Sequence, residues 1–212
     1  MPTHTLDHLP EGAVLHGVTA EPVDLDGRPC LRVELTDDLT FNGTWGVDFV
    51  DQPTYVELPI EFTTGRIDVA LRSRLNGKGP EECRAFAGLA YRIKDGTKAF
   101  ESVYLRPLNG LKVDPPGPRG QRAVQHFAYP DWPFDRLREE RPGLYESAAD
   151  IGPDEWIQLS VDVAADGVVV RIDDQVVLQV DQPLAEPSIG TVGLFVDIGT
   201  EAFFADLQVT PA

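Results

Sequence analysis

Cysteines and basic residues are both scarce in this 212-residue chain. The two cysteines, Cys30 and Cys83, lack the spacing of a metal site, which favours free, buried thiols over a disulfide framework. Lysine and arginine together number 18, against 35 aspartates and glutamates, so the formal net charge is -17. Such a charge repels phosphate backbones and anionic membrane surfaces, and we therefore expect no nucleic-acid or membrane partner.

Long apolar runs and targeting signals are also missing. No apolar run approaches the length of a membrane span, and the N-terminal residues do not place a basic segment before an apolar one. A chain of this size buries roughly 70% of its unfolded surface, so it needs no disulfide for stability. The sequence therefore predicts a cytoplasmic protein and leaves its oligomeric state open.

The common catalytic and metal-binding signatures are absent as well. The chain has no His-Glu-x-x-His, no phosphate-binding glycine loop, no Gly-x-Ser-x-Gly elbow, no zinc spacing and no Glu-x-Asp-x-x-Glu strand of the kind found in sandwich glucanases. The acidic turns Asp166-Gly167 and Asp173-Asp174 lack the spacing of an EF-hand calcium loop. We therefore expect no cofactor, while a structural calcium at an edge of the fold stays open.

Short, alternating apolar segments run through almost the whole chain and predict β-strands. They lie at residues 13–18, 30–35, 55–60, 67–75, 86–93, 100–106, 156–163, 168–172, 176–180, 190–196 and 202–209.

The connections between these segments are of the kind that joins antiparallel strands. Asp26-Gly27 and Asp95-Gly96 predict tight turns. Residues 41–50 are expected to form a loop with an aromatic plug, and residues 135–140, just after residue 134, the only short helix. This pattern predicts an all-β fold, a two-sheet antiparallel jelly-roll sandwich that forms one domain over residues 1–212.

One stretch, residues 100–132, concentrates charged and aromatic side chains. It begins with the strand 100–106, continues through a Pro/Gly-rich connection, and ends in the polar-aromatic run 125–132. Side chains alternate along a strand, so Glu101 should point inward while Tyr104 and Arg106 point outward. We interpret the run 125–132 as a loop that folds over this outward face.

Two further arginines, Arg72 and Arg74, are expected to point the same way from a neighbouring strand. Together these side chains would form a cationic and aromatic pocket on an otherwise acidic protein. The catalytic candidates are His126, whose ordinary pKa suits a general base, and Glu101. The ligand-binding candidates are Arg72, Arg74, Tyr104, Arg106, Asn109, Gln125, Tyr129, Asp131 and Trp132.

Each candidate also has a purely structural interpretation. The arginines could pair with the abundant carboxylates, and an inward Glu101 could be clamped by an arginine instead of acting as an acid or base. His126 could be structural. Tyr129 and Trp132 could stack on a sugar ring or simply close the end of the sandwich, and Asp131 could accept a sugar hydroxyl or only form a turn.

The string Tyr104-Leu105-Arg106-Pro107-Leu108-Asn109-Gly110 resembles a known pattern, which continues into later parts of the chain. The matching pieces are Gln125-His126-Phe127, Tyr129-Pro130, Trp132, Leu137-Arg138, Pro142, Tyr145-Glu146-Ser147, Glu155-Trp156 and Gly199-Thr200-Glu201-Ala202-Phe203-Phe204. With these, the chain is similar, from about residue 85 onward, to bacterial concanavalin A-like lectin/glucanase-fold proteins related to the 3-keto-disaccharide hydrolase domain. The resemblance implies a jelly-roll sandwich with a ligand groove on its concave sheet and a carbohydrate or glycoside-derived ligand, and it supplies no catalytic set.

Three functions fit these observations. The first is binding of a carbohydrate or another small molecule, which we rank highest. The second is a hydrolase or lyase acting on a sugar, and the third is a non-catalytic interaction or structural domain. Because this fold class hosts all three, the choice depends on the site rather than on the fold.

Overall fold

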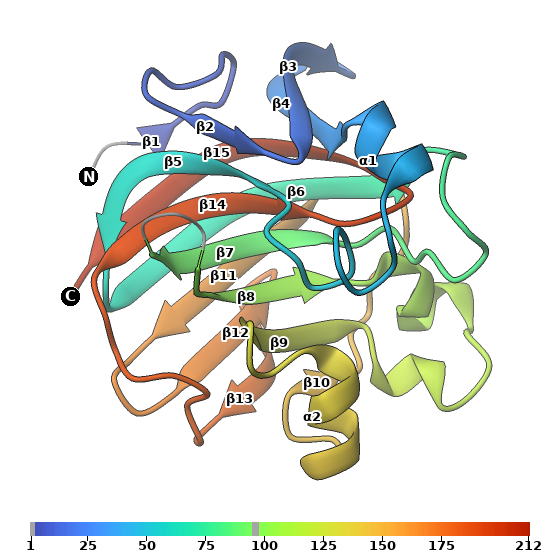
Figure 1. Ribbon diagram of the computed structural model, residues 1–212, viewed down its shortest axis with the longest axis vertical. Coiled ribbons are helices and arrows are strands. Elements are labelled where there is room, and N and C mark those ends of the chain that lie inside the picture. Colours follow the sequence, from blue (N-terminus) through green and yellow to red (C-terminus); the bar gives the residue numbers. More distant parts are fainter. Residues whose placement is uncertain (1–2, 95–97) are drawn as a thin grey trace.

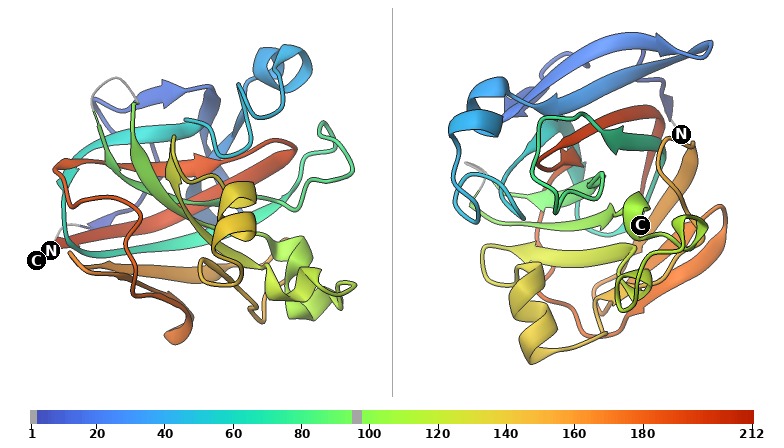
Figure 2. Two further views of the ribbon diagram at one scale, coloured as in Figure 1. Left: turned by 60° about the horizontal axis from the view of Figure 1, so that its bottom comes forward. Right: turned by 90° about the vertical axis from the view of Figure 1, so that its right-hand side faces the viewer.

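The computed structural model describes residues 3–94 and 98–212, which form two antiparallel sheets packed face to face. The predicted turn at Asp95-Gly96 lies outside the described residues. Figure 1 shows the two layers one behind the other, and the right-hand view of Figure 2 shows them closer to edge-on. The all-β sandwich predicted from the sequence is therefore confirmed.

The first layer, sheet A, has eight strands in the order β13-β12-β11-β6-β15-β4-β3, with β1 also paired to β15. Its strands are β1 (Thr3–His4), β3 (Val18–Leu25), β4 (Arg28–Leu35), β6 (Gly65–Leu75), β11 (Ile157–Val163), β12 (Val168–Ile172), β13 (Gln175–Val180) and β15 (Thr200–Pro211).

The second layer, sheet B, has seven strands in the order β10-β9-β8-β7-β14-β5-β2. Its strands are β2 (Val14–His16), β5 (Tyr55–Phe62), β7 (Ala87–Ile93), β8 (Phe100–Leu105), β9 (Val124–Tyr129), β10 (Glu146–Ser147) and β14 (Gly190–Val196).

The hydrophobic core lies between the sheets, because the strands of each layer turn every second side chain toward the other layer. Buried residues such as Val69 and Leu159 of sheet A join Leu89, Val103 and Leu194 of sheet B in one apolar cluster. The two cysteines are free and buried, as the sequence predicted. None of the helices among the described residues has the length and apolar composition needed to cross a membrane.

Helices are few and lie outside the sheets. They are α1 (Asp37–Asn42), α2 (Phe134–Glu140) and the 3-10 turns η2 (Pro107–Asn109), η3 (Leu111–Val113) and η4 (Arg119–Gln121). Helix α2 confirms the helix predicted after residue 134. In Figure 1, α2 and the connection from α1 to β5 both lie in front of sheet B, and Figure 2 (right) places them on the side away from sheet A.

The expectation of a single short helix was wrong, because α1 occupies the start of the region predicted as a loop. The side chain of Thr36 accepts a hydrogen bond from the backbone N–H of Leu39, and Asp37 and Asp38 lie in the first turn. A threonine cap followed by two acidic residues is a helix-start signal in the sequence. The aromatic plug remains in the connection, where Trp45 packs edge-on against the buried Phe49 at a centroid distance of 6.2 Å.

The run at residues 125–132 is also not the loop that we expected. Most of it is strand β9, which pairs with β8 in the register Ser102 opposite Phe127 and Tyr104 opposite Gln125. Alternation along Val124–Tyr129 sends its large side chains to both faces of the sheet. This segment therefore extends sheet B and does not cover it. The cover comes instead from α2 and the α1–β5 connection.

The close approach of β7 and β8 depends on Gly88. A Cβ atom built at Gly88 would collide with the carbonyl oxygen of Val103 and lie 2.5 Å from the Cα of Tyr104, both of them backbone atoms. We predict that Gly88→Ala lowers the free energy of unfolding by about 3 kcal/mol, because the β8 backbone must shift to admit the methyl group. Urea denaturation measures this change.

Gly152→Ala is the matched control, since its Cβ would meet only side-chain atoms at 3.5 Å or more. We expect a change below about 1 kcal/mol for the control. Equal stability of the two variants would contradict the proposed role of Gly88.

Candidate functional site

Strand β8 divides its side chains between the interior and the outer face of sheet B. Glu101 points into the space between the sheets, as predicted, and is 2% exposed. Tyr104 points to the outer face, where its ring packs against Phe127 and Phe195 at centroid distances of 5.7 and 5.5 Å. The two catalytic candidates and the ligand-binding candidates of this stretch are thereby separated by the sheet itself.

Glu101 belongs to a fully buried polar network. Its Oε1 accepts a hydrogen bond from Arg92 Nη1 at 2.6 Å, and its Oε2 lies 3.4 Å from His126 Nε2. The same His126 nitrogen is 2.9 Å from the hydroxyl of Tyr91. Burial opposes ionisation of Glu101, but the contacts with His126 and Arg92 outweigh it and hold the pKa of this carboxyl below its ordinary value.

This geometry favours the structural interpretation of Glu101 and His126. Glu101 is held by an arginine clamp, one of the two alternatives that the sequence left open. His126 has no exposed surface, and neither residue lines the cavities described below. A ligand in those cavities would have no contact with either side chain, so the structure removes the support for a catalytic role of this pair.

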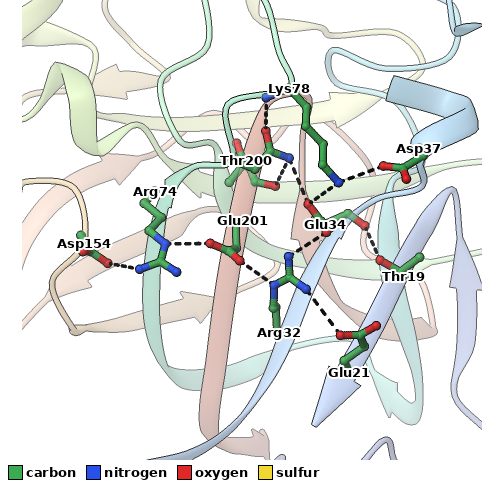
Figure 3. A network of polar contacts seen from close by, with 11 residues as sticks. Thr19, Glu21, Arg32, Glu34, Asp37, Arg74, Lys78, Asp154, Thr200 and Glu201 are labelled. Atoms are coloured by element: carbon green, nitrogen blue, oxygen red, sulfur yellow. Dashed lines mark hydrogen bonds and ion pairs between the residues drawn. The ribbon is translucent and has the colours of Figure 1, made fainter. Parts of the chain in front are cut away.

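Arg72 and Arg74 do not join the site, and the expectation that their strand neighbours β8 was wrong. They lie on β6 in sheet A, and their ion pairs reach Asp154, Asp26 and Glu201 at distances between 2.7 and 3.4 Å. Figure 3 shows Arg74 in a chain of ion pairs that continues through Glu201 to Arg32. Pairing with carboxylates, the structural alternative, therefore describes both arginines.

Arg106 is the buried cation of the site. Its Nη2 donates to the Tyr104 hydroxyl at 2.7 Å and to Gln125 Oε1 at 3.1 Å, and its Nη1 donates to the carbonyl of Arg122 at 3.3 Å. The guanidinium carbon also lies 5.5 Å from the centre of the Phe134 ring, on helix α2. Helix α2 and strand β9 thus fix the orientation of a charged group that is only 3% exposed.

A cavity of about 230 Å³ opens beside Arg106 and Tyr104, and we call it the arginine cavity. Its lining combines five arginines with aromatic side chains and only two carboxylates. The lining residues are Trp45, Val50, Glu82, Arg84, Phe86, Tyr104, Arg106, Asn109, Arg119, Arg122, Phe134, Arg138 and Asp197. The cavity therefore has the cationic and aromatic character that the sequence predicted, although most of its lining residues differ from those expected.

A second cavity of about 250 Å³ adjoins the first and shares Trp45, Val50 and Phe134 with it. We call it the tyrosine cavity, because Tyr129 lines it, and we call the two cavities together the groove. Its other lining residues are Gly46, Asp51, Gln52, Phe127, Pro130, Pro133 and Asp135. Trp45 is 50% exposed and borders both cavities, which makes it the most accessible aromatic surface of the groove.

Two buried aspartates hold the walls of the groove in place. Asp197 accepts backbone hydrogen bonds from Val50, Asp51 and Ile198 at 2.7 to 3.0 Å. Asp51 accepts a hydrogen bond from the backbone of Phe134 at 2.7 Å, which ties the α1–β5 connection to the start of α2. Val50 and Asp51 both adopt positive φ angles, of 72° and 57°, so these contacts maintain an unfavourable backbone conformation.

The protonation state of Asp51 is unusual for a carboxyl group. Burial, and then the nearby charge of Asp197, raise the pKa of Asp51 to about 7. Its Oδ1 atom is buried without a hydrogen-bond partner. Near neutral pH the group therefore carries a proton for much of the time.

The remaining candidates divide between the groove and its surroundings. Asn109 lines the arginine cavity, and Gln125 lies behind it as an acceptor for Arg106. Trp132 is covered by two guanidinium groups, of Arg136 and Arg141, each 4.2 Å from its ring centre, so its faces are occupied. Asp131 is exposed at the turn before α2 and lines neither cavity.

The sequence reasoning missed several residues of the groove. Trp45 lies within residues 41–50, which the sequence predicts as a loop with an aromatic plug, and Asp51, Arg84, Arg119 and Asp197 belong to no motif. These residues come from segments far apart in the sequence, and only the fold brings them together. The resemblance already contained one useful signal, since it included Arg138, which lines the arginine cavity.

No group of three or more His, Cys, Asp or Glu side chains suited to a metal ion occurs within residues 3–94 and 98–212. Calcium also accepts backbone carbonyl ligands, so a structural calcium at the edge of the fold stays a prediction.

Two solved structures from Bacillus subtilis share this fold. The carbohydrate binding module CBM66 has a TM-score of 0.55 and 12% sequence identity, covering 91% of this chain and 94% of that one. A protein of unknown function with a galectin-like fold has a TM-score of 0.56 and 10% identity, covering 98% and 93%. No protein-family model and no curated protein matches the sequence. The structural neighbours confirm the concanavalin A-like fold, and the closer relation to the 3-keto-disaccharide hydrolase domain stays a prediction.

A substitution at Glu101 tests the structural role of the interior network. Glu101→Gln leaves Arg92 buried without its counter-charge, and we predict a loss of about 3 to 5 kcal/mol in the free energy of unfolding, measured by urea denaturation. Glu140→Gln, which breaks the exposed pair with Arg136, is the control and should cost less than about 0.5 kcal/mol. A Glu101→Gln protein as stable as the control would contradict this role.

A substitution at Asp51 tests its raised pKa. The folded protein keeps a proton on Asp51 that the unfolded chain releases above its ordinary pKa of 3.8, so the contribution of Asp51 to wild-type stability falls as the pH rises from about 4 to about 7. The amide side chain that Asp51→Asn introduces stays neutral and can still accept the hydrogen bond from Phe134. We predict a melting temperature higher than that of the wild type by roughly 5 °C at pH 8, with the difference vanishing near pH 4.

Thermal unfolding between pH 4 and pH 8 makes this comparison, with Asp131→Asn at an exposed position as the control. A pH-independent difference between Asp51→Asn and the wild type would show that Asp51 does not titrate in this range.

Proposed function

We propose that the protein binds a carbohydrate ligand in the groove on the outer face of sheet B. The observation that carries the proposal is the half-exposed indole of Trp45, which borders both cavities, while buried polar residues such as Asn109 line the same groove. The C–H face of a sugar ring suits such an aromatic surface, while its hydroxyl groups need fixed hydrogen-bond partners. The groove offers both within one site.

The composition of the groove supports this proposal further. Apolar surface comes from Phe86, Phe134 and Tyr129, and hydrogen-bonding groups come from Asn109 and Gln52. Clefts that combine aromatic and apolar surface with fixed polar groups are typical of small-molecule sites. CBM66, which has the same fold, is a carbohydrate binding module, and this supports the choice of a sugar among small molecules.

Sugar hydrolysis is the second candidate function. For the general acid of such a reaction, Asp51 is a better candidate than His126 or Glu101, because it lines the groove. A general acid must carry its proton near the working pH, and the raised pKa of Asp51 meets that requirement. Asp197 supplies a second carboxyl group, which also raises the pKa of Asp51. The test measures turnover of an aryl glycoside by the wild type and by Asp51→Asn. Hydrolysis would be established if the wild type turns the substrate over and the variant does not, while the variant keeps its glycan affinity.

Substitution of Trp45 tests carbohydrate binding. A glycan array identifies the best-bound oligosaccharide, and isothermal titration calorimetry then measures its affinity. We predict that Trp45→Ala weakens binding about tenfold, because the stacking contact is lost while the rest of the groove is kept.

Phe41→Ala is the matched control, since Phe41 is an exposed aromatic residue that lines neither cavity. We expect its affinity to equal that of the wild type. If no glycan is retained on the array, or if both variants bind equally well, the carbohydrate proposal fails.

A further inference from the structure

The distribution of arginines singles out one part of the groove. The chain has fourteen arginines and a formal net charge of -17, yet five of these arginines line the arginine cavity. Only two carboxylates line it with them, Glu82 and the buried Asp197. The site therefore reverses the charge of the molecule within a cavity of about 230 Å³.

Three of these arginines are held from behind by one carboxylate. Glu146, on strand β10, lies 2.8 Å from Arg138, 3.4 Å from Arg122 and 3.6 Å from Arg106. A single negative charge cannot neutralise three positive ones, so the group retains an excess of positive charge. Glu146 instead orients the three guanidinium groups. A second anion, bound on the cavity side, would neutralise their remaining positive charge.

The other two arginines form no ion pair with a carboxylate among the described residues, although the charges of Glu82 and Glu81 act on Arg84 from a greater distance. Within residues 3–94 and 98–212, no ion pair reaches Arg84 or Arg119, in contrast to the paired Arg28, Arg32 and Arg66. The Nη1 atom of Arg84 donates only to the backbone carbonyls of Glu81 and Cys83, at 2.5 and 2.6 Å. Burial, and then the charge of Arg119, lower the pKa of Arg84, so the two cations repel each other across the site.

The same cavity contains an acceptor that lacks a donor. Asn109 is 5% exposed, and its Nδ2 atom donates to the carbonyl of Arg122 at 3.1 Å. Its Oδ1 atom is buried and has no hydrogen-bond partner. An unpaired buried acceptor is costly, and a rotation of the Asn109 side chain toward the cavity would let a hydroxyl group of a ligand satisfy it. Inorganic sulfate, which is fully ionised at pH 7, has no such hydroxyl group.

We infer that the arginine cavity binds the negatively charged group of an acidic sugar, with Arg84 and Arg119 facing the anion and Asn109 accepting a sugar hydroxyl. The inference rests on the proposed carbohydrate binding and specifies its ligand class. A uronic acid carboxylate, a sulfate ester and a phosphate ester share the required chemistry, because guanidinium groups donate paired hydrogen bonds to all three. The adjoining tyrosine cavity then holds the neighbouring sugar unit.

The experiment compares charged sugars with neutral ones of the same shape. Isothermal titration calorimetry at pH 7 measures glucuronate and galacturonate against glucose and galactose, with glucose 6-sulfate and glucose 6-phosphate as the other anionic probes. We expect at least one anionic sugar to bind about tenfold or more tightly than its neutral counterpart, and the preference to shrink as sodium chloride is added.

The variants Arg84→Gln and Arg119→Gln assign the preference to the cavity. Each should weaken binding of the anionic sugar about tenfold while leaving the affinity for the neutral sugar unchanged. Arg28→Gln, which removes an arginine paired with Asp206 on sheet A, is the matched control and should change neither affinity. Asn109→Leu should weaken binding of sugars but not of inorganic sulfate, which has no O–H group to donate.

The outcomes distinguish a failure of this inference from a failure of the proposed carbohydrate binding. Equal binding of neutral and anionic sugars, both weakened by Trp45→Ala, would overturn the charge preference and keep the carbohydrate site. Inorganic sulfate that binds as tightly as the anionic sugars would overturn the role of the sugar ring. Failure of every sugar to bind, with Trp45→Ala matching the wild type, would overturn the carbohydrate site itself.

Discussion

The groove depends on the way in which one buried carboxylate, Asp197, holds the α1–β5 connection against sheet B. It accepts three backbone hydrogen bonds, two of them from residues with positive φ angles, Val50 and Asp51. Without these acceptors the connection would expose its N–H groups to an apolar surrounding, which is costly. The position of Trp45 above the two cavities follows from this anchoring, because Trp45 belongs to the same connection.

The balance of charged side chains differs between the outer faces of the two sheets. On sheet A, arginines pair with carboxylates in ion-pair chains in which the carboxylates outnumber the cations. Around the arginine cavity the cations outnumber the anions, and part of their charge has no partner among the described residues. In a strongly acidic protein such an excess of positive charge attracts anions to one site and leaves the rest of the surface repulsive to them.

The sequence predicted the architecture well because strand alternation and turn residues are local signals. The hairpin at Asp26-Gly27, most strands of both sheets (β9 excepted) and the inward direction of Glu101 all follow from neighbouring residues. The assignment of strands to sheets did not follow, since β6 and β8 look alike in sequence but lie in different layers. For that reason Arg72 and Arg74 were placed beside Arg106, although they lie on the opposite side of the sandwich.

The site was predicted in its chemical character but only partly in its members. Tyr104, Arg106 and Asn109 line the arginine cavity, as their positions on the strand 100–106 and the turn after it suggested. Tyr129 lines the tyrosine cavity, although it lies on β9 and not on the loop that we expected. The pairing of His126 with Glu101 and Tyr91 depends on the register of β7, β8 and β9, which the sequence alone does not specify. Arg84, Arg119 and Asp51 reach the groove through tertiary contacts that leave no periodic pattern.

Most of the groove wall comes from connections, not from the hydrogen-bonded ladders. Trp45, Asp51 and Gln52 lie before β5, Arg119 and Arg122 lie before β9, and Phe134 and Arg138 lie on α2. Insertions and exchanges in such segments leave the strand register intact. Ligand preference in this protein can therefore diverge rapidly between related lineages, or be redesigned in the laboratory, while the scaffold beneath stays constant.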